Sequence, residues 1–305
     1  MVIGEKLPWR LVLKAHWGWL AAVFVVAFGA RVWIFYGGKI PFTPVPFQIA
    51  GIAIAFFLAF RNNSSYDRWW EGRKLWGAIT NSSRTFARQV MSFIDGGSDD
   101  ERRAFQQELV YRHIAFLNAL RAQLRGQPPA QDLEKLVSPD ELEALKSQKN
   151  VAAWLLHTNG VRLSQAVKKG LLSEQRHVWL DMTLSELVNS QGGCERIKST
   201  PIPVAYRFFT HRFTRLFVVV LPLGLVEQLG AMTIGTVMAL AFIFLVLDTI
   251  GRILEDPFSL GPNGLALSAM CRNIEINLRQ QLGESAAGLP AAIVPEHRGP
   301  VDVLM

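Results

Sequence analysis

Three large apolar residues, Ile52, Phe56 and Phe60, recur at every fourth position in one apolar segment. Positions four apart share one face of a helix, so these side chains would form a single row. If several copies of the helix met around an axis, rows pointing inward would stack into rings that narrow a water-filled path. Such a constriction controls ion passage by expelling water and needs no charged group. The alternative is that the row simply packs against other helices.

A row of small residues runs beside the first row, one position round the helix. Small side chains let helix backbones approach closely inside a membrane, so this row could bring copies of the helix together. A helix that only anchors a protein needs neither row, so the pair of rows argues against a simple anchor. It leaves open whether the large residues line a constriction or pack against other helices. The small residues are Gly51, Ala55 and Ala59.

The chain turns abruptly polar after this segment, yet it contains no proline or glycine for several turns. The helix is therefore expected to continue from an apolar environment into water. Asn62 and Asn63 would stand just below the constriction, where they offer neutral dipoles to an ion regaining its hydration. Upstream, Pro44 and Pro46 mark the expected start of the helix. Its free N–H groups would favour anions, although the two prolines could merely shape the turn.

The composition places the chain partly in a membrane. Half of its 305 residues are hydrophobic, 19% are charged, and the formal net charge is +7. Nucleic-acid binding is not supported, because the sequence has no basic run, zinc-ligand spacing or aromatic RNA-binding strand. Four segments are apolar enough to span a bilayer as helices. They cover residues 17–38, 44–60, 216–230, where Pro222 breaks the pattern, and 231–251.

The distribution of lysine and arginine predicts the topology. The short links within each pair of spans carry few of these residues, whereas the long central segment and the C-terminal tail carry many. Positively charged segments remain on the cytoplasmic side, so four spans with both termini in the cytoplasm are expected. The central segment is predicted to form helices, with starts at 99–101 and at Ser138 and Pro139. No alternation typical of strands is found, and the predicted fold is all-α.

Residues that could support catalysis or bind a metal are scattered. The six histidines show no metal-ligand spacing, and Cys194 and Cys271 form no CxxC pair. No acid, base and nucleophile can be grouped, so the chain is not predicted to be an enzyme, and no metal or cofactor is expected. Asp248 and Glu227 lie in or beside apolar segments, where ionisable groups are functional candidates by default. Glu227 also fits a headgroup position.

The stretch FRNNSSYDRWWEGRKLWG, residues 60–77, resembles the signature that follows the second span in the bestrophin family. Residues 43–60 resemble the family's pore-helix segment. Residues 194–217 resemble its approach to the third span, and residues 253–278 resemble the stretch after the fourth. The four likenesses follow one another in the family's order. The chain is thus identified as similar to the bacterial bestrophins.

The resemblance implies a homopentameric ion channel in a bacterial inner membrane, with four spans per subunit and a helical cytosolic region. Monovalent ions would pass passively through a hydrophobic neck formed by Ile52, Phe56 and Phe60. A second, cytosolic aperture would be formed by Val178 or, failing that, Leu172. The partners of the protein would be further copies of the chain, membrane lipid and the permeant ions. Chloride conduction is the family default, and sodium conduction is the alternative.

Two expectations qualify the resemblance. Eukaryotic bestrophins bind calcium through an acidic run after the fourth span, but only Glu255 and Asp256 are acidic in the corresponding stretch. Calcium requires six to eight oxygen ligands, so no calcium clasp of that kind is expected. A membrane-anchored helical scaffold or signalling protein remains the alternative from another functional class.

The sequence divides into four expected regions. An N-terminal amphipathic segment and the first two spans, with the neck on the second, occupy residues 1–60. The cytosolic helical region follows at 61–207, spans three and four at 208–254, and a C-terminal helix and tail at 255–305.

Overall fold

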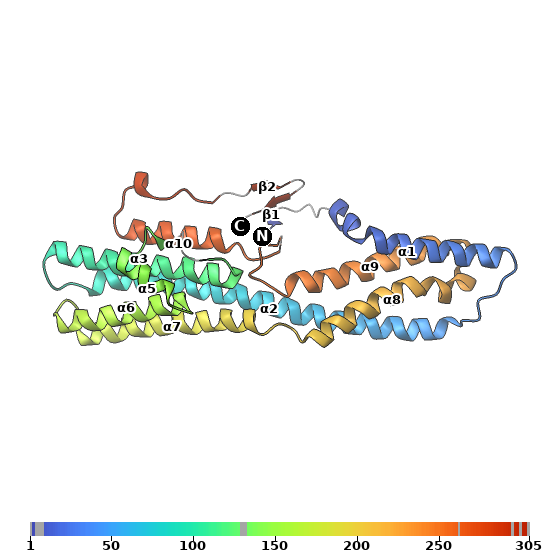
Figure 1. Cartoon of the computed structure of the whole chain (residues 1–305), viewed down its shortest axis with the longest axis horizontal. Coiled ribbons are helices and arrows are strands. Elements are labelled where there is room, and N and C mark those ends of the chain that lie inside the picture. Colours follow the sequence, from blue (N-terminus) through green and yellow to red (C-terminus); the bar gives the residue numbers. More distant parts are fainter. Residues whose placement is uncertain are drawn as a thin grey trace. The chain divides into compact units, whose positions relative to one another are not determined.

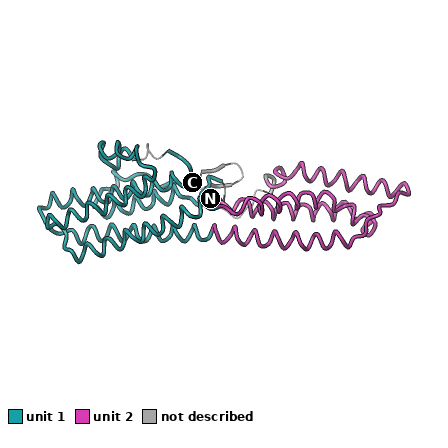
Figure 2. The backbone as a smooth tube through the Cα atoms, turned by 60° about the horizontal axis from the view of Figure 1, so that its bottom comes forward, with its two compact units in different colours: residues 1–3, 70–200, 257–305 teal, residues 4–69, 201–256 magenta. Residues whose placement is uncertain are grey.

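The computed structural model is predominantly helical (Figure 1). The residues it describes are 2–3, 9–128, 133–261, 263–293, 296–298 and 301–303. The chain divides into two compact units, shown in Figure 2. Unit 1 consists of residues 1–3, 70–200 and 257–305, and unit 2 consists of residues 4–69 and 201–256. The predicted all-α class is confirmed by the likeness to solved structures described below, whereas the four expected regions stay a prediction.

Unit 2 is built from apolar helices. It contains α1 (Trp9–Phe35), the first half of α2 (Pro44–Phe93), α8 (Val204–Leu229) and α9 (Thr233–Leu254). A single 3-10 turn, Gly230–Met232, joins α8 to α9. Helix α1 packs against α8 and α9, which also pack against each other. Their shared core consists of Leu20, Val23, Ala27, Phe217, Val218, Leu221, Val237, Ala241 and Leu245.

Three helical stretches among the described residues are long and apolar enough to cross a membrane: Val12–Phe35, Pro44–Phe93 and Val204–Leu254. The third contains both α8 and α9, and the four-span count, which separates them, stays a prediction. The sequence pattern suggested a break at Pro222, but α8 runs through this buried residue without interruption. Proline is tolerated in apolar spans because packed neighbours and small local adjustments compensate for the missing hydrogen bond.

Helix α2 is continuous, as expected from the absence of helix breakers after the apolar segment. Its 50 residues would measure about 75 Å at 1.5 Å per residue, more than twice the hydrocarbon thickness of a bilayer. The same helix therefore contributes an apolar half to unit 2 and a polar half to unit 1.

Unit 1 contains α3 (Asp99–Arg125), α5 (Pro139–Lys146), α6 (Val151–Lys168), α7 (Glu174–Ser199) and α10 (Leu267–Gln281). A 3-10 turn, Ala286–Gly288, follows α10. Helix α3 packs against α6, α7 and α10, so it lies at the centre of the unit.

Side chains fix where the helices of unit 1 begin and end. The hydroxyl of Ser98 accepts a hydrogen bond from the backbone N–H of Glu101 at the start of α3, and Ser138 caps α5 in the same way. Gly126 ends α3 in the left-handed conformation, with φ of 65°, which glycine adopts without steric cost. The predicted helix starts at 99–101 and at Ser138 are therefore confirmed.

A small sheet near the chain ends was not expected. Its antiparallel strands are β1 (Val2–Ile3), β2 (Glu296–Arg298) and β3 (Val301–Val303), in the order β1-β3-β2. Strands of two or three residues are too short to leave a periodic pattern in a sequence.

A buried histidine makes the stability of unit 1 dependent on pH. Burial lowers the pKa of His113 to about 3, and its Nε2 lies 2.9 Å from the hydroxyl of Ser83. The folded state thus keeps this ring neutral, whereas the unfolded chain protonates it below its ordinary value of 6.5. The neutral, buried His113 therefore contributes its full share to the free energy of unfolding above pH 6.5, and this share is lost as the pH falls toward 3. At pH 5 the loss should reach about 2 kcal/mol.

Denaturant unfolding of the purified protein between pH 7 and pH 5 tests this expectation. The His113→Leu variant should show a flatter pH profile than the natural chain over this range. The exposed His157 provides a matched control, and His157→Leu should leave the profile unchanged. If the natural chain and His113→Leu lost stability equally between pH 7 and pH 5, His113 would not be the source of the pH dependence.

Candidate functional site

The predicted row on α2 is exposed in the single chain. Ile52, Phe56 and Phe60 are 71%, 63% and 55% exposed, respectively. The rings of Phe56 and Phe60 meet edge to face, with centroids 4.7 Å apart. Large apolar side chains are costly to leave in water, so this face requires lipid or other copies of the chain against it.

The small-residue row has two different environments. A Cβ on Gly51 would lie 3.1 Å from the ring of Phe217, so this glycine is the point where α2 packs closely against α8 of the same chain. Ala55 and Ala59 are exposed and available for contacts with another helix. The expected close approach between copies therefore rests on the two alanines.

A buried stripe on α2 sets the orientation of the exposed row. Leu58, Arg61 and Ser65 are each no more than 1% exposed. Their spacing of three and four residues defines one helix face. Because this stripe is held within unit 2, the row of Ile52, Phe56 and Phe60 must point away from the unit's own helices.

The stripe contains a charged residue, Arg61, which pairs with Asp248 of α9. The Nη1 atom of Arg61 lies 2.8 Å from Oδ1 of Asp248, and its Nη2 donates to the backbone carbonyl of the same residue. The other carboxylate oxygen of Asp248 lies 2.6 Å from Nδ1 of His211 on α8. Sequence reasoning selected Asp248 as an ionisable residue at membrane depth but did not identify either partner.

The two asparagines predicted to stand below the constriction differ in environment. The amide of Asn62 donates to the carbonyl of Leu247 at 3.1 Å, which directs it toward α9. Asn63 is exposed. Lining of a vestibule by these residues stays a prediction, and the geometry favours Asn63 for that role.

Helix α2 begins at Pro44, so both Pro44 and Pro46 lie in its first turn. Glu227, near the end of α8, accepts a hydrogen bond from the backbone N–H of Ile40 at 3.3 Å. The carboxylate thereby holds the loop that leads into α2. A role for the helix start in attracting anions stays a prediction.

The two aperture candidates lie in unit 1. Val178, on α7, is 57% exposed, whereas Leu172, just before α7, is 3% exposed. A side chain lining an aperture must reach the water-filled path, so the structure favours Val178 over Leu172. The aperture itself stays a prediction.

Glu255 and Asp256 form an acidic pair directly after α9. The backbone carbonyl of Glu255 accepts from Nε of Arg68 at 3.3 Å, and its carboxylate faces Arg207 at 3.5 Å. Glu255 is thus engaged with two arginines. Among the described residues, no cluster of three or more histidine, cysteine, aspartate or glutamate side chains could hold a metal ion.

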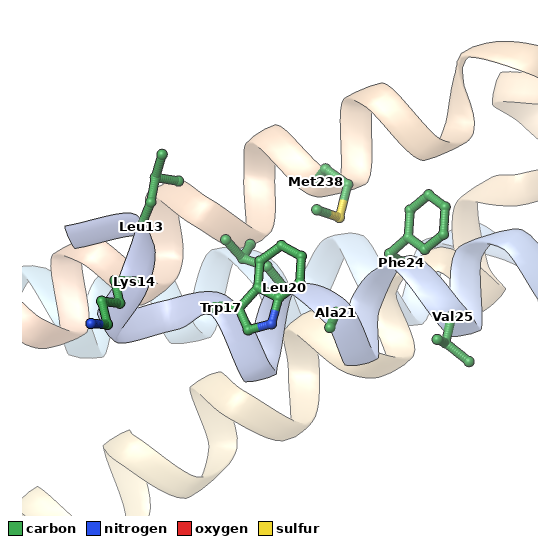
Figure 3. A pocket seen from close by; sticks show the side chains of 8 residues that line it. All are labelled: Leu13, Lys14, Trp17, Leu20, Ala21, Phe24, Val25 and Met238. Atoms are coloured by element: carbon green, nitrogen blue, oxygen red, sulfur yellow. The ribbon is translucent and has the colours of Figure 1, made fainter. Parts of the chain in front are cut away.

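A groove of about 950 Å³ lies on α1 (Figure 3). Among the described residues that line it, Lys14 is the only charged one, and the others are apolar or aromatic. Because no set of polar groups converges there, the groove does not resemble an ion-binding site. It is lined by Leu13, Lys14, Trp17, Leu20, Ala21, Phe24 and Val25 of α1 and by Met238 of α9.

Comparisons with known proteins identify the family of the chain. The family model described as "Bacterial/Fungal Bestrophin protein" matches residues 6–280. The voltage-dependent anion channel-forming protein YneE of Escherichia coli (strain K12) is 36% identical over 292 residues, covering 96% of this chain and 91% of YneE. The voltage-dependent anion channel-forming protein RSc3414 of Ralstonia nicotianae is 38% identical, covering 81% of this chain and 80% of RSc3414.

A solved structure also places the chain among the bacterial bestrophins. The bacterial bestrophin homologue from Klebsiella pneumoniae is similar with a TM-score of 0.81 and 32% identity, covering 88% of this chain and 98% of that protein. This likeness and the family match both extend over most of the sequence. The chain therefore belongs to the bestrophin family.

Proposed function

We propose that this protein is a subunit of a bestrophin-type ion channel, in which monovalent ions pass passively through a hydrophobic neck. The observation that carries the proposal is the exposed row of Ile52, Phe56 and Phe60, which the rest of unit 2 leaves uncovered. Five copies would place this row around a central axis and cover Ala55 and Ala59 between neighbours. The family is one of channels and not of enzymes.

The chain is a membrane protein, and the proposal adds its arrangement in the membrane. Helices α1, α8, α9 and the first half of α2 would form four spans in a bacterial inner membrane, with both termini in the cytoplasm. The polar half of α2 and the helices of unit 1 would then lie in the cytoplasm, where Val178 is the candidate for a second aperture. The pairing of α8 with α9 through a single 3-10 turn supports an external hairpin.

Chloride is the proposed ion. Two relatives are named as anion channel-forming proteins, and the free N–H groups at the start of α2 would favour a negative charge. The neck residues carry no charge of their own and thus do not select the sign of the ion. A sodium-selective channel is therefore the alternative for the same neck, and a membrane-anchored scaffold is the alternative without one.

Current recordings across bilayers that contain the purified protein test the proposal. Under a tenfold sodium chloride gradient, a channel selective for chloride should reverse near the chloride equilibrium potential, about 59 mV from zero. A reversal of opposite sign would support sodium selectivity and contradict chloride conduction. Currents no larger than those of protein-free bilayers would contradict the channel and favour the scaffold.

A further inference from the structure

The buried contacts of Arg61 and Asp248 lie directly beside the proposed neck. Arg61 follows Phe60 in sequence, so the position of its guanidinium determines how α2 presents the preceding ring. Arg61 is 1% exposed and Asp248 is 2% exposed. Ionisable residues in an apolar span are costly and persist where they are paired and perform a function.

Several hydrogen bonds meet at one residue of α9, Asp248. Arg61 donates to both the side chain and the backbone carbonyl of Asp248. His211 occupies the remaining carboxylate oxygen at 2.6 Å. Two helices therefore converge on one carboxylate, and a planar guanidinium with two donors to one residue allows little rotation.

Neighbouring contacts restrain α2 at the same level. Asn62 donates to the carbonyl of Leu247, one residue before Asp248. A Cβ on Gly251 would lie 2.1 Å from Oδ1 of Asn62 and 2.9 Å from Nε of Arg61, so glycine is what permits this approach. The contacts of α2 with Leu247, Asp248 and Gly251 span about one turn of α9. These contacts restrain both the sliding of α2 along α9 and its rotation about its own axis, immediately after Phe60.

The neck residues have no comparable restraint from the part of the chain that the structure describes. Phe56 and Phe60 are more than half exposed, and among the described residues the one aromatic contact recorded for either ring is the contact between them. Within one chain, their positions are consequently set mainly by the backbone of α2. The first rigid anchor after them is Arg61.

We propose that Arg61 and Asp248 form a positioning pair that holds Phe60 at a single radius in the neck. This inference rests on the proposed channel function. Loss of the pair should let α2 rotate or slide, so that the five Phe60 rings no longer adopt one arrangement. A uniform open-channel current should then split into several levels, because the narrowest point of the path would vary.

Single-channel recordings of a double-mutant cycle test the pair. Arg61→Gln should convert one open level into several sublevels, and Arg61→Lys, which keeps the charge but lacks the planar fork, should show fewer sublevels than Arg61→Gln without restoring the single level. In the Phe60→Ala background, Arg61→Gln should produce no further splitting, because the ring through which it acts is gone. The exposed Arg212 of α8, which lies over the ring of Phe208, is the matched control, and Arg212→Gln should keep one level.

The outcomes separate the inference from the proposed function. If Phe60→Ala leaves the current unchanged, the neck assignment itself is overturned. If Phe60→Ala alters the current but Arg61→Gln has the same effect in both backgrounds, only the positioning role is overturned. If the Arg61→Gln protein fails to assemble, the double variant Arg61→Gln with Asp248→Asn replaces it in the test, because it removes both charges of the pair and leaves neither unpaired. It should assemble and show the same sublevels, and a single level would overturn the inference.

Discussion

Replacement of Phe56 by alanine is expected to raise the basal ion flux of the channel about tenfold. A decrease of about 1.4 kcal/mol in the barrier is sufficient for this change. In the proposed neck, a hydrophobic constriction blocks ions by expelling water, and removal of a bulky ring from every subunit would widen the path and keep it wet. Phe56 is the middle residue of the row, and the centroid of its ring lies 4.7 Å from that of Phe60.

Chloride release from liposomes that contain equal amounts of assembled protein measures this change. Phe28 of α1 offers a matched control, because it is also an exposed phenylalanine of an apolar span, at 52%. Phe28→Ala should leave the flux within a factor of about two of the natural chain, since its barrier effect should stay well under 1.4 kcal/mol. Equal flux for Phe56→Ala and the natural chain would place the constriction elsewhere.

Helical periodicity was sufficient to predict the row that this experiment targets. The spacing of Ile52, Phe56 and Phe60 requires only that the segment be a helix, because positions four apart share a face regardless of the surrounding fold. The continuity of α2 beyond Phe60 was predictable for the same reason, since the absence of local breakers is a property of the segment itself. The exposure of the row could be learned only from the structure.

Features that depend on packing between distant segments were not predictable. Arg61 and Asp248 are separated by 187 positions, and their pairing follows from the height at which α2 meets α9. Sequence reasoning could identify Asp248 as unusual, but it had no means of choosing a partner among many arginines. An arginine immediately after the apolar row was the available signal, because a second ionisable group at membrane depth requires compensation.

The environment of Leu172 illustrates the same limit. An apolar residue between two helices can line an opening or enter a core, and composition does not distinguish these outcomes. In the structure Leu172 is 3% exposed, whereas Val178 on the next helix is 57% exposed. Burial in a helical bundle is decided by how the helices pack, which a single sequence does not specify.

The largest stability effect is expected in unit 1, at an ion cluster built around Arg112. Its guanidinium donates to both carboxylate oxygens of Glu141, at 2.6 and 3.0 Å, and to Glu108 at 2.9 Å. Burial alone would raise the pKa of Glu108, but hydrogen bonds from Arg162 and Arg112 hold it below its ordinary value. The cluster is therefore charged and mutually compensated, so that removal of one member leaves a buried charge without its partner.

Arg112→Met should lower the free energy of unfolding by about 3–5 kcal/mol, the usual cost of breaking a buried ion pair. Glu108 retains Arg162 at 2.6 Å, so the cost should arise mainly at Glu141, whose side chain is 10% exposed. Urea unfolding of the purified protein, followed by circular dichroism, measures the change. The partly exposed pair of Arg102 with Asp99 gives the control, since surface pairs contribute about 0–1 kcal/mol.

A second substitution distinguishes loss of charge compensation from loss of packing. If the unpaired carboxylate is the cause, Glu141→Gln in the Arg112→Met background should recover part of the lost stability, because the amide carries no charge. If the aliphatic part of the arginine is what matters, the double variant should be no more stable than Arg112→Met. Partial recovery would show that the unpaired carboxylate of Glu141, and not the lost packing of the arginine stem, accounts for that part of the cost.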